Sequence, residues 1–152
     1  MKFIMTRKFP ENLPETVKFM DSHILINNGF SFSFNPILCA ECRGKCCKST
    51  NKPSYLWITL EELGRIASFL NITEPDFKKN FLRRENGLHN IKDIKVDGIY
   101  SCIFLDIPSG KCSIYDVRPK QCRDYPFWDY YKNNCDDLFS ECIAVAKNNS
   151  TL

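Results

Sequence analysis

The apolar positions near the start of the chain predict one helix and one strand. Val17, Met20 and Ile24 fall three and four residues apart, so we expect an amphipathic helix over residues 14–27. Residues 31–34 read Ser-Phe-Ser-Phe. This strict alternation predicts a short strand.

Two more helices are predicted between residues 59 and 82. Thr59 and Glu62 have the spacing of a capping box, in which each side chain accepts a hydrogen bond from the other residue's backbone N–H. The apolar residues on one face of the helix that follows are Leu60, Leu63, Ile66, Ala67 and Leu70. Thr73 is placed to cap the second helix, with Pro75 in its first turn. The positions expected to face the core there are Phe77, Phe81 and Leu82.

The pattern changes after residue 100, where it predicts a β-hairpin and a final helix. Residues 102–106 and 111–115 flank Pro108-Ser109-Gly110, a composition typical of a turn. Such a turn would bring Cys102 and Cys112 close together across the strand pair. One face of the final helix is expected to carry Cys135, Leu138 or Phe139, Cys142 and Ala146.

Together these elements predict an α+β fold, a small single domain of several helices with a short β-hairpin. With 152 residues and 43% apolar content, the chain can form a hydrophobic core without depending on metal staples. We expect one domain over residues 1–152, with residues 1–35 as an extension packed on the rest. The formal charge of +3 includes no long basic run, so no nucleic-acid footprint is evident. No apolar run reaches the roughly eighteen residues that a membrane span needs.

Cysteine is the residue that carries candidate chemistry. Four cysteines stand within nine residues, at Cys39, Cys42, Cys46 and Cys47, and five more follow at Cys102, Cys112, Cys122, Cys135 and Cys142. Thiols this crowded are typical of a soft metal, an inorganic cluster or disulfides. Residues 1–21 lack the apolar run of a secretory signal, so we expect a cytoplasmic protein with reduced thiols, which favours metal over disulfide. The odd count of nine also argues against complete pairing within one chain.

Three blocks of the chain carry a more specific pattern. Residues 39–47 read C-x2-C-x3-C-C, and residues 55–66 read Y-x-W-I-T-L-E-E-x-x-R-I. The third block runs from Cys102 to Phe127 and contains G-x-C-x-I-Y-x-x-R-P-x-x-C-R-x-Y-P-F. Over about residues 36–142 these blocks resemble the YkgJ-type cysteine-cluster family, whose domain is described as zinc- or iron-chelating. Cys142 matches the last cysteine usual in that family, whereas Cys135 has no clear counterpart.

The resemblance and the cysteine count imply the same set of metal ligands. Without Cys135, eight cysteines remain, which divide into two sets of four. The expected ligands are Cys39, Cys42, Cys46, Cys47, Cys102, Cys112, Cys122 and Cys142. Because adjacent side chains seldom chelate one small ion, we expect Cys46 and Cys47 to serve two centres or opposite edges of one larger cluster. The chain has a single C-x2-C pair, and its later cysteines are dispersed, which favours an iron–sulfur cluster, with zinc as the alternative.

The function implied is cytosolic metal binding through clustered thiolates. Arg118 and Arg123 stand beside cluster cysteines and are expected to donate hydrogen bonds to the thiolates or offset their charge. The domain could then be a redox or accessory component, or a structural zinc domain that mediates interaction with a protein partner. The family is also similar to the cysteine-rich part of flagellin lysine N-methylases, so a part in such a system is a further alternative. No nucleophile or general base can be named, which leaves catalysis open.

Overall fold

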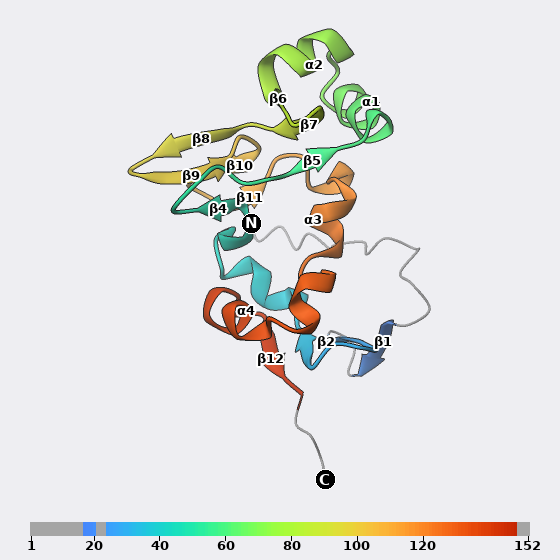
Figure 1. Ribbon diagram of the computed structural model, residues 1–152, viewed down its shortest axis with the longest axis vertical. Helices are drawn as coiled ribbons and strands as arrows, with labels where there is room; N and C mark the ends of the chain where they lie inside the picture. The colour runs from blue at the N-terminus through green and yellow to red at the C-terminus, as the bar shows by residue number, and fades with distance from the viewer. Residues whose placement is uncertain (1–16, 21–23, 149–152) are drawn as a thin grey trace, which may run out of the picture.

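The computed structural model describes residues 17–20 and 24–148 of the chain (Figure 1). Its α-helices are α1 (Leu60–Phe69), α2 (Glu74–Phe81), α3 (Lys120–Asp124) and α4 (Cys135–Glu141). Its short 3-10 helices are η1 (Pro36–Ala40), η2 (Lys45–Cys47), η3 (Tyr115–Val117) and η4 (Asp129–Lys132). None of the helices in the described ranges is long and apolar enough to cross a bilayer.

The strands pair antiparallel in several small sheets. The first has the order β1-β2-β3-β12, formed by Val17–Met20, Ile24–Asn27, Phe32–Phe34 and Val145–Lys147. The second has the order β5-β7-β6, formed by Trp57–Ile58, Leu88–Ile91 and Leu82–Glu85. The third has the order β4-β9-β8, formed by Lys48–Ser49, Ile99–Cys102 and Asp93–Val96. The last sheet pairs β10 (Leu105–Asp106) with β11 (Lys111–Cys112).

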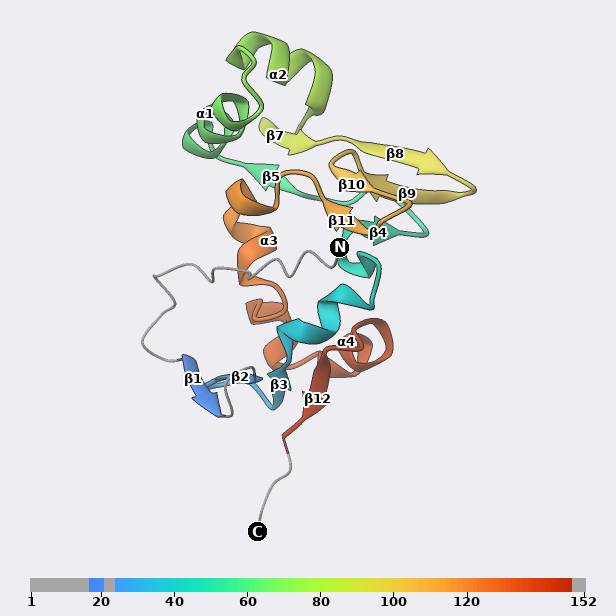
Figure 2. The ribbon, with the colours of Figure 1, turned by 180° about the vertical axis from the view of Figure 1, so that it is seen from behind.

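These elements form two parts, which both ribbon views separate clearly (Figures 1 and 2). The upper part holds α1, α2, the second and third sheets and the β10–β11 pair, around a core that includes Leu63, Ile66 and Phe77. The lower part holds the first sheet and α4, around smaller cores that include Phe32 and Leu138. The segment with η1 and η2 lies between β4 and α4, and α3 runs between the two parts.

The expected α+β fold of several helices with a short β-hairpin is wrong. Strands outweigh helices as the organising elements, and they form several small sheets, with no simple pattern of helices and one hairpin. The strands at β4, β5, β10 and β11 are each two residues long, too short to give an alternating pattern in the sequence. Their pairing depends on partners far along the chain, which local periodicity cannot indicate.

The helix expected over residues 14–27 is also wrong wherever the structure describes that segment. β1 and β2 lie there and pair in the register Val17 with Asn27 and Met20 with Ile24. Residues 14–16 and 21–23 of the prediction lie outside the described residues. The segment is rich in β-branched residues, and β2 continues into a sheet with β3, so pairing outweighs the helical spacing. The strand expected over residues 31–34 is confirmed as β3, with Phe32 and Phe34 buried.

The two central helices are confirmed. Thr59 and Glu62 form the capping box, and Thr73 caps α2 by accepting from the N–H of Asp76. Leu60 departs from the expected apolar face of α1 and is 68% exposed, whereas the other predicted positions of that face are buried or half-buried. Leu82 is buried as expected, but it lies at the start of β6 rather than in α2.

The C-terminal third follows the predicted order of elements with shifted boundaries. The turn before Gly110 joins β10 to β11, and Leu105 pairs with Cys112. Cys102 lies one element earlier, at the end of β9. The final helix is α4, which ends at Glu141, so that Ala146 falls in β12 instead.

Candidate metal centre

The loop that carries the first four cysteines packs directly on the turn between β10 and β11. Arg43 donates from its Nη2 to the carbonyl of Pro108 across 2.7 Å. Gly110 lies so close that a Cβ atom there would be 2.5 Å from the Cα of Arg43. Gly44 adopts φ +74° and begins η2, and a Cβ on it would be 2.6 Å from the Leu105 side chain. Glycine is therefore required on both sides of this contact, which holds η2 against the β10–β11 pair.

Four cysteines, which we call the upper group, gather around this contact: Cys47, Cys102, Cys112 and Cys122. The pairing of Lys48 with Ser101 sets Cys47 beside Cys102, and Cys47, Cys102 and Cys112 pack in the core of the upper part. Burial, together with the neighbouring thiols, raises the pKa of both Cys102 and Cys122 to about 12. Burial likewise raises the pKa of Cys112. These thiols come from four separate elements, η2, β9, β11 and α3.

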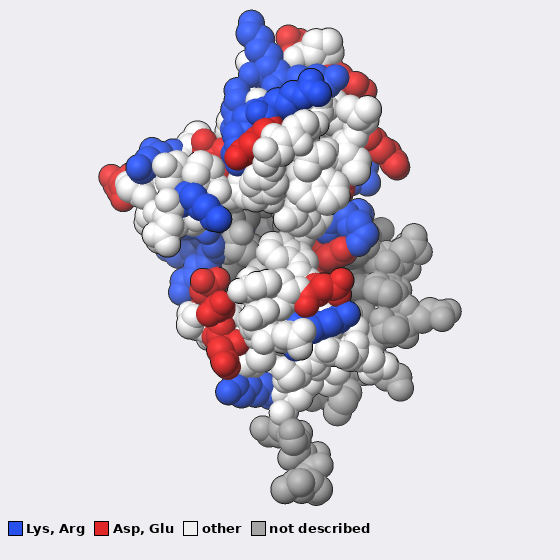
Figure 3. All heavy atoms as spheres, in the orientation of Figure 1, with Lys and Arg blue, Asp and Glu red and all other residues white. Residues whose placement is uncertain are grey.

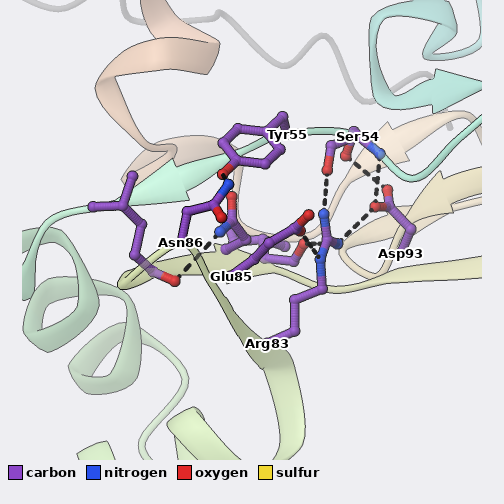
Figure 4. A network of polar contacts seen from close by, with 9 residues as sticks. Ser54, Tyr55, Arg83, Glu85, Asn86 and Asp93 are labelled. Carbon is purple, nitrogen blue, oxygen red and sulfur yellow. Dashed lines mark hydrogen bonds and ion pairs between the residues drawn. The ribbon is translucent and has the colours of Figure 1, made fainter.

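A buried polar network lies behind Cys102. Asp93, whose side chain is only 2% exposed, pairs with Cys102 in the β8–β9 register. Its carboxylate accepts from the N–H and hydroxyl of Ser54 at 2.9 and 2.8 Å and from the Arg83 guanidinium at 3.3 Å. Arg83 also donates to the carbonyl of Ser54 across 2.7 Å. Asp93 and Arg83 therefore both bind Ser54 and fix the segment that follows the cysteine loop, as Figure 4 shows. The network joins the second sheet to the third and fixes the strand that ends in Cys102.

Two side chains of α1 hold the helix that carries Cys122 in place. The first backbone N–H of α3, at Lys120, donates to Glu62 Oε1 across 2.7 Å. Arg65, one turn further along α1, donates to the carbonyl of Arg118 across 3.4 Å. Both contacts hold the start of α3 against α1, and with it the thiol of Cys122.

Three cysteines, which we call the lower group, lie on the other side of the loop: Cys39, Cys42 and Cys142. Cys39 and Cys142 pack against the same core of Leu25, Phe34 and Ala144. Burial raises the pKa of Cys142, a hydrogen bond from the Tyr125 hydroxyl opposes that rise, and the nearby Cys42 thiol adds to it. Tyr125 belongs to the third block of the sequence pattern, and its hydrogen bond to a thiol is visible only in the structure.

Cys46 lies between the two groups. Its thiol influences the pKa of Cys112 and Cys122 on one side and of Cys142 on the other. A hydrogen bond from Cys47 lowers the pKa of Cys46 to about 7, and the Arg118 guanidinium contributes in the same direction. The same hydrogen bond raises the pKa of Cys47. The Cys46 thiol therefore ionises more readily than the thiols of the upper group.

The two arginines singled out from the sequence occupy different surroundings. Arg118 is half-buried, stacks on the Tyr115 ring with 3.7 Å between its guanidinium carbon and the ring centre, and donates to the Tyr115 carbonyl. Its charge acts on Cys46, Cys112 and Cys122. Arg123 is exposed in the last turn of α3.

Cys135 lies in the lower part, at the start of α4. It packs with the cluster of Phe32, Tyr131 and Leu138, and the Ser31 hydroxyl donates to its sulfur across 3.5 Å. That it is no metal ligand stays a prediction. Of the two histidines in the chain, His23 lies outside the described residues and His89 lies in β7.

The donor chemistry of the gathered thiols fits zinc or iron. Soft thiolate ligands suit both, and the cation at Arg118 offsets the negative charge that such a site carries. Across residues 17–20 and 24–148, no three histidine, cysteine, aspartate or glutamate side chains already converge at metal-ligand geometry. The fold thus gathers thiols from distant segments, with Cys46 between the upper and lower groups.

Comparison with known proteins decides the family. Residues 38–145 match a family model named CxxCxxCC and described as a "Putative zinc- or iron-chelating domain". The chain belongs to this family. The match confirms the YkgJ-type resemblance, and it supports metal binding as the function of the domain.

A relative from Methanocaldococcus jannaschii, the uncharacterized protein MJ0661, is 37% identical over 89 residues. The match takes in 59% of this chain and 43% of that protein, so the chain spans less than half the length of this relative. No solved structure matches the chain.

Proposed function

We propose that this protein binds iron or zinc through eight thiolates arranged as two adjoining sets of four. Cys47, Cys102, Cys112 and Cys122 would form one set, and Cys39, Cys42, Cys46 and Cys142 the other. The observation that carries the proposal is the position of the adjacent pair Cys46 and Cys47. Cys47 packs with the upper group, whereas Cys46 also reaches Cys142 of the lower group.

An iron–sulfur cluster is our preferred occupant. The eight cysteines come from segments far apart in sequence, and a cluster is wide enough to collect dispersed ligands. The thiols also lie between two small hydrophobic cores, a setting in which solvent exposure and hydrogen bonds to sulfur tune a redox potential. The bound group would supply electron transfer, and Arg118 would offset its negative charge.

We further propose a cytoplasmic redox or accessory protein that serves a partner. The chain of residues 1–152 would act as one domain, since β2 and β3 from its start join β12 from its end in one sheet. The alternative is a structural zinc domain that presents a surface to another protein.

Anaerobic purification followed by elemental analysis and absorption spectroscopy tests the proposal. We expect metal in stoichiometric amount, with a broad band near roughly 400 nm if the occupant is an iron–sulfur cluster. A colourless protein with stoichiometric zinc would rule out the iron–sulfur cluster and favour the structural zinc domain. A folded protein with neither metal would refute the proposed function.

A further inference from the structure

A small pocket opens beside the thiols, between the cysteine loop and the C-terminal helices. Its volume is about 170 Å³, and the loop contributes Lys45, Cys46 and Lys48 to its lining. The rest of the lining comes from Tyr125, from Trp128 and Tyr131 in the η4 region, and from Glu141 at the end of α4. The space-filling view shows this face hollowed between the upper and lower parts, with both basic and acidic side chains near the hollow (Figure 3).

The wall on the side of η4 is flat, aromatic and held in place. Trp128 and Tyr131 stack with ring centres 5.9 Å apart and planes inclined by 14°. The indole N–H of Trp128 donates to the carbonyl of Gln121 across 2.8 Å, so the ring cannot swing away without losing that bond. This wall offers an apolar surface to the body of a ligand.

Side chains of both charges line the pocket. Lys45 and Lys48 bring two ammonium groups on the loop side, and Glu141 brings one carboxylate from α4. The ion pairs between described residues involve none of these three side chains. Two cations and one anion around a single cavity are the complement of a small molecule that carries both carboxylate and ammonium groups.

We propose that this pocket binds a free α-amino acid beside the metal centre. The α-carboxylate of the ligand would pair with Lys45, its ammonium with Glu141, and the aliphatic part of its side chain would lie on the wall of Trp128 and Tyr131. A second carboxylate on the ligand would match the second lysine, so L-glutamate should bind more tightly than L-leucine. At about 170 Å³ the cavity is small, which favours a ligand of few atoms such as an amino acid.

The position of this pocket beside a metal centre rests on the proposed function, because Cys46 lines the pocket and is also a proposed metal ligand. An amino acid held there would lie against the metal centre. Binding itself, however, needs only the two lysines, the carboxylate and the aromatic wall. The two proposals can therefore fail separately.

Isothermal titration calorimetry of the full chain with L-glutamate tests the pocket. We expect saturable binding at one site, weaker binding of L-leucine, and no binding of n-butylamine, which lacks a carboxylate. Glutarate, which lacks the ammonium, should bind at least about tenfold more weakly than L-glutamate. Lys45→Ala and Glu141→Gln should each raise the Kd of L-glutamate about tenfold. The matched controls Lys52→Ala and Glu61→Gln, both at exposed positions away from the pocket, should leave it unchanged.

Metal content is measured on the same preparations. One outcome is metal-loaded protein that gives no saturable heat with L-glutamate or L-leucine up to about 10 mM, a concentration above the usual micromolar to millimolar range of binding constants. That result would overturn the proposed amino-acid site and leave the metal proposal intact. Glutarate binding as tightly as L-glutamate overturns the amino-acid assignment. Metal-free protein that still binds L-glutamate, with the expected losses in the two variants, supports the pocket and refutes the metal proposal.

Discussion

The Glu62 carboxylate accepts a hydrogen bond from the backbone N–H of Lys120, with 2.7 Å between Oε1 and N. Its second oxygen accepts from the N–H of Thr59 across 2.9 Å and completes the capping box of α1. One side chain thus satisfies N-terminal N–H groups of two helices, α1 and α3. Because α3 carries Cys122, a capping residue of the scaffold also positions a proposed metal ligand.

Replacing Glu62 should destabilise the fold and disturb Cys122. We expect Glu62→Gln to lower the free energy of unfolding by about 1–2 kcal/mol at pH 7, because hydrogen bonds to a buried carboxylate are stronger than those to an amide. Urea denaturation measures the change. Glu61→Gln, at an exposed position in the same turn, is the control. Equal midpoints for the two variants would show that the bond to Lys120 contributes nothing.

The contribution of Glu62 should also depend on pH. Burial raises its pKa, but the hydrogen bonds from Lys120 and Thr59 outweigh burial and hold the pKa below the usual value. A carboxyl group with a lowered pKa in the folded state stabilises the fold above its unfolded pKa, about 4.3, and this stabilisation disappears as the pH falls through the folded pKa. The difference between wild type and Glu62→Gln should therefore shrink below about pH 4 in a series of urea titrations. A constant difference down to pH 2 would contradict the assignment.

The contact between the cysteine loop and the β10–β11 turn can be tested with two glycines of similar conformation. Gly110 has φ +68° and Gly87 has φ +76°, so alanine strains the backbone similarly at both. Only at Gly110 would the added Cβ meet a neighbour, the backbone of Arg43, whereas nothing lies within 4 Å at Gly87. We expect Gly110→Ala to cost about 1–3 kcal/mol more than Gly87→Ala and to reduce metal content. Thermal unfolding and elemental analysis measure both effects, and similar behaviour of the two variants would exclude a role for the contact.

Metal stoichiometry distinguishes the proposed ligands from the remaining cysteine. Cys122→Ser should lower the metal content, because it removes a half-buried thiol from the upper group. Cys135→Ser should leave the content unchanged, since Cys135 packs in the lower core against Phe32 and Leu138. Loss of metal in Cys135→Ser but not in Cys142→Ser would mean that the last ligand is misassigned.

Arg118 and Arg123 provide a test of charge at the centre. We expect Arg118→Gln to weaken metal affinity about 10- to 100-fold, because the guanidinium acts on three of the proposed ligand thiols. Arg123→Gln should have a smaller effect, since Arg123 is exposed at the end of α3. Competition with a chromophoric chelator measures both affinities. A larger loss in Arg123→Gln would reverse their proposed roles.

The family, the cysteines and the two central helices could be read from the chain alone. The capping signals at Thr59 and Thr73 act over three residues, so their hydrogen bonds form wherever the helix starts. The strand at residues 32–34 follows from the alternation of two phenylalanines that both become buried. The spacing within residues 39–47 was enough to indicate a shared site for the thiols.

Other features depended on partners distant in sequence. β2 looked helical by spacing, and only pairing with β1 and β3 made it a strand. Which thiols lie together was likewise undetermined, because Cys102 and Cys122 reach Cys47 through the β4–β9 pairing and through α3. The second hydrogen bond of Glu62 spans 58 residues, and no local signal marks it.

The sequence by itself thus determined the family, with its clustered cysteines, and where the main helices begin, since both follow from side-chain chemistry and short-range hydrogen bonds. Only the tertiary structure decided how the small sheets pair, which thiols form the upper and lower groups, and that a charged aromatic pocket adjoins Cys46. Those outcomes depend on contacts between segments up to about a hundred residues apart, whose closure is favoured only when the whole fold is formed.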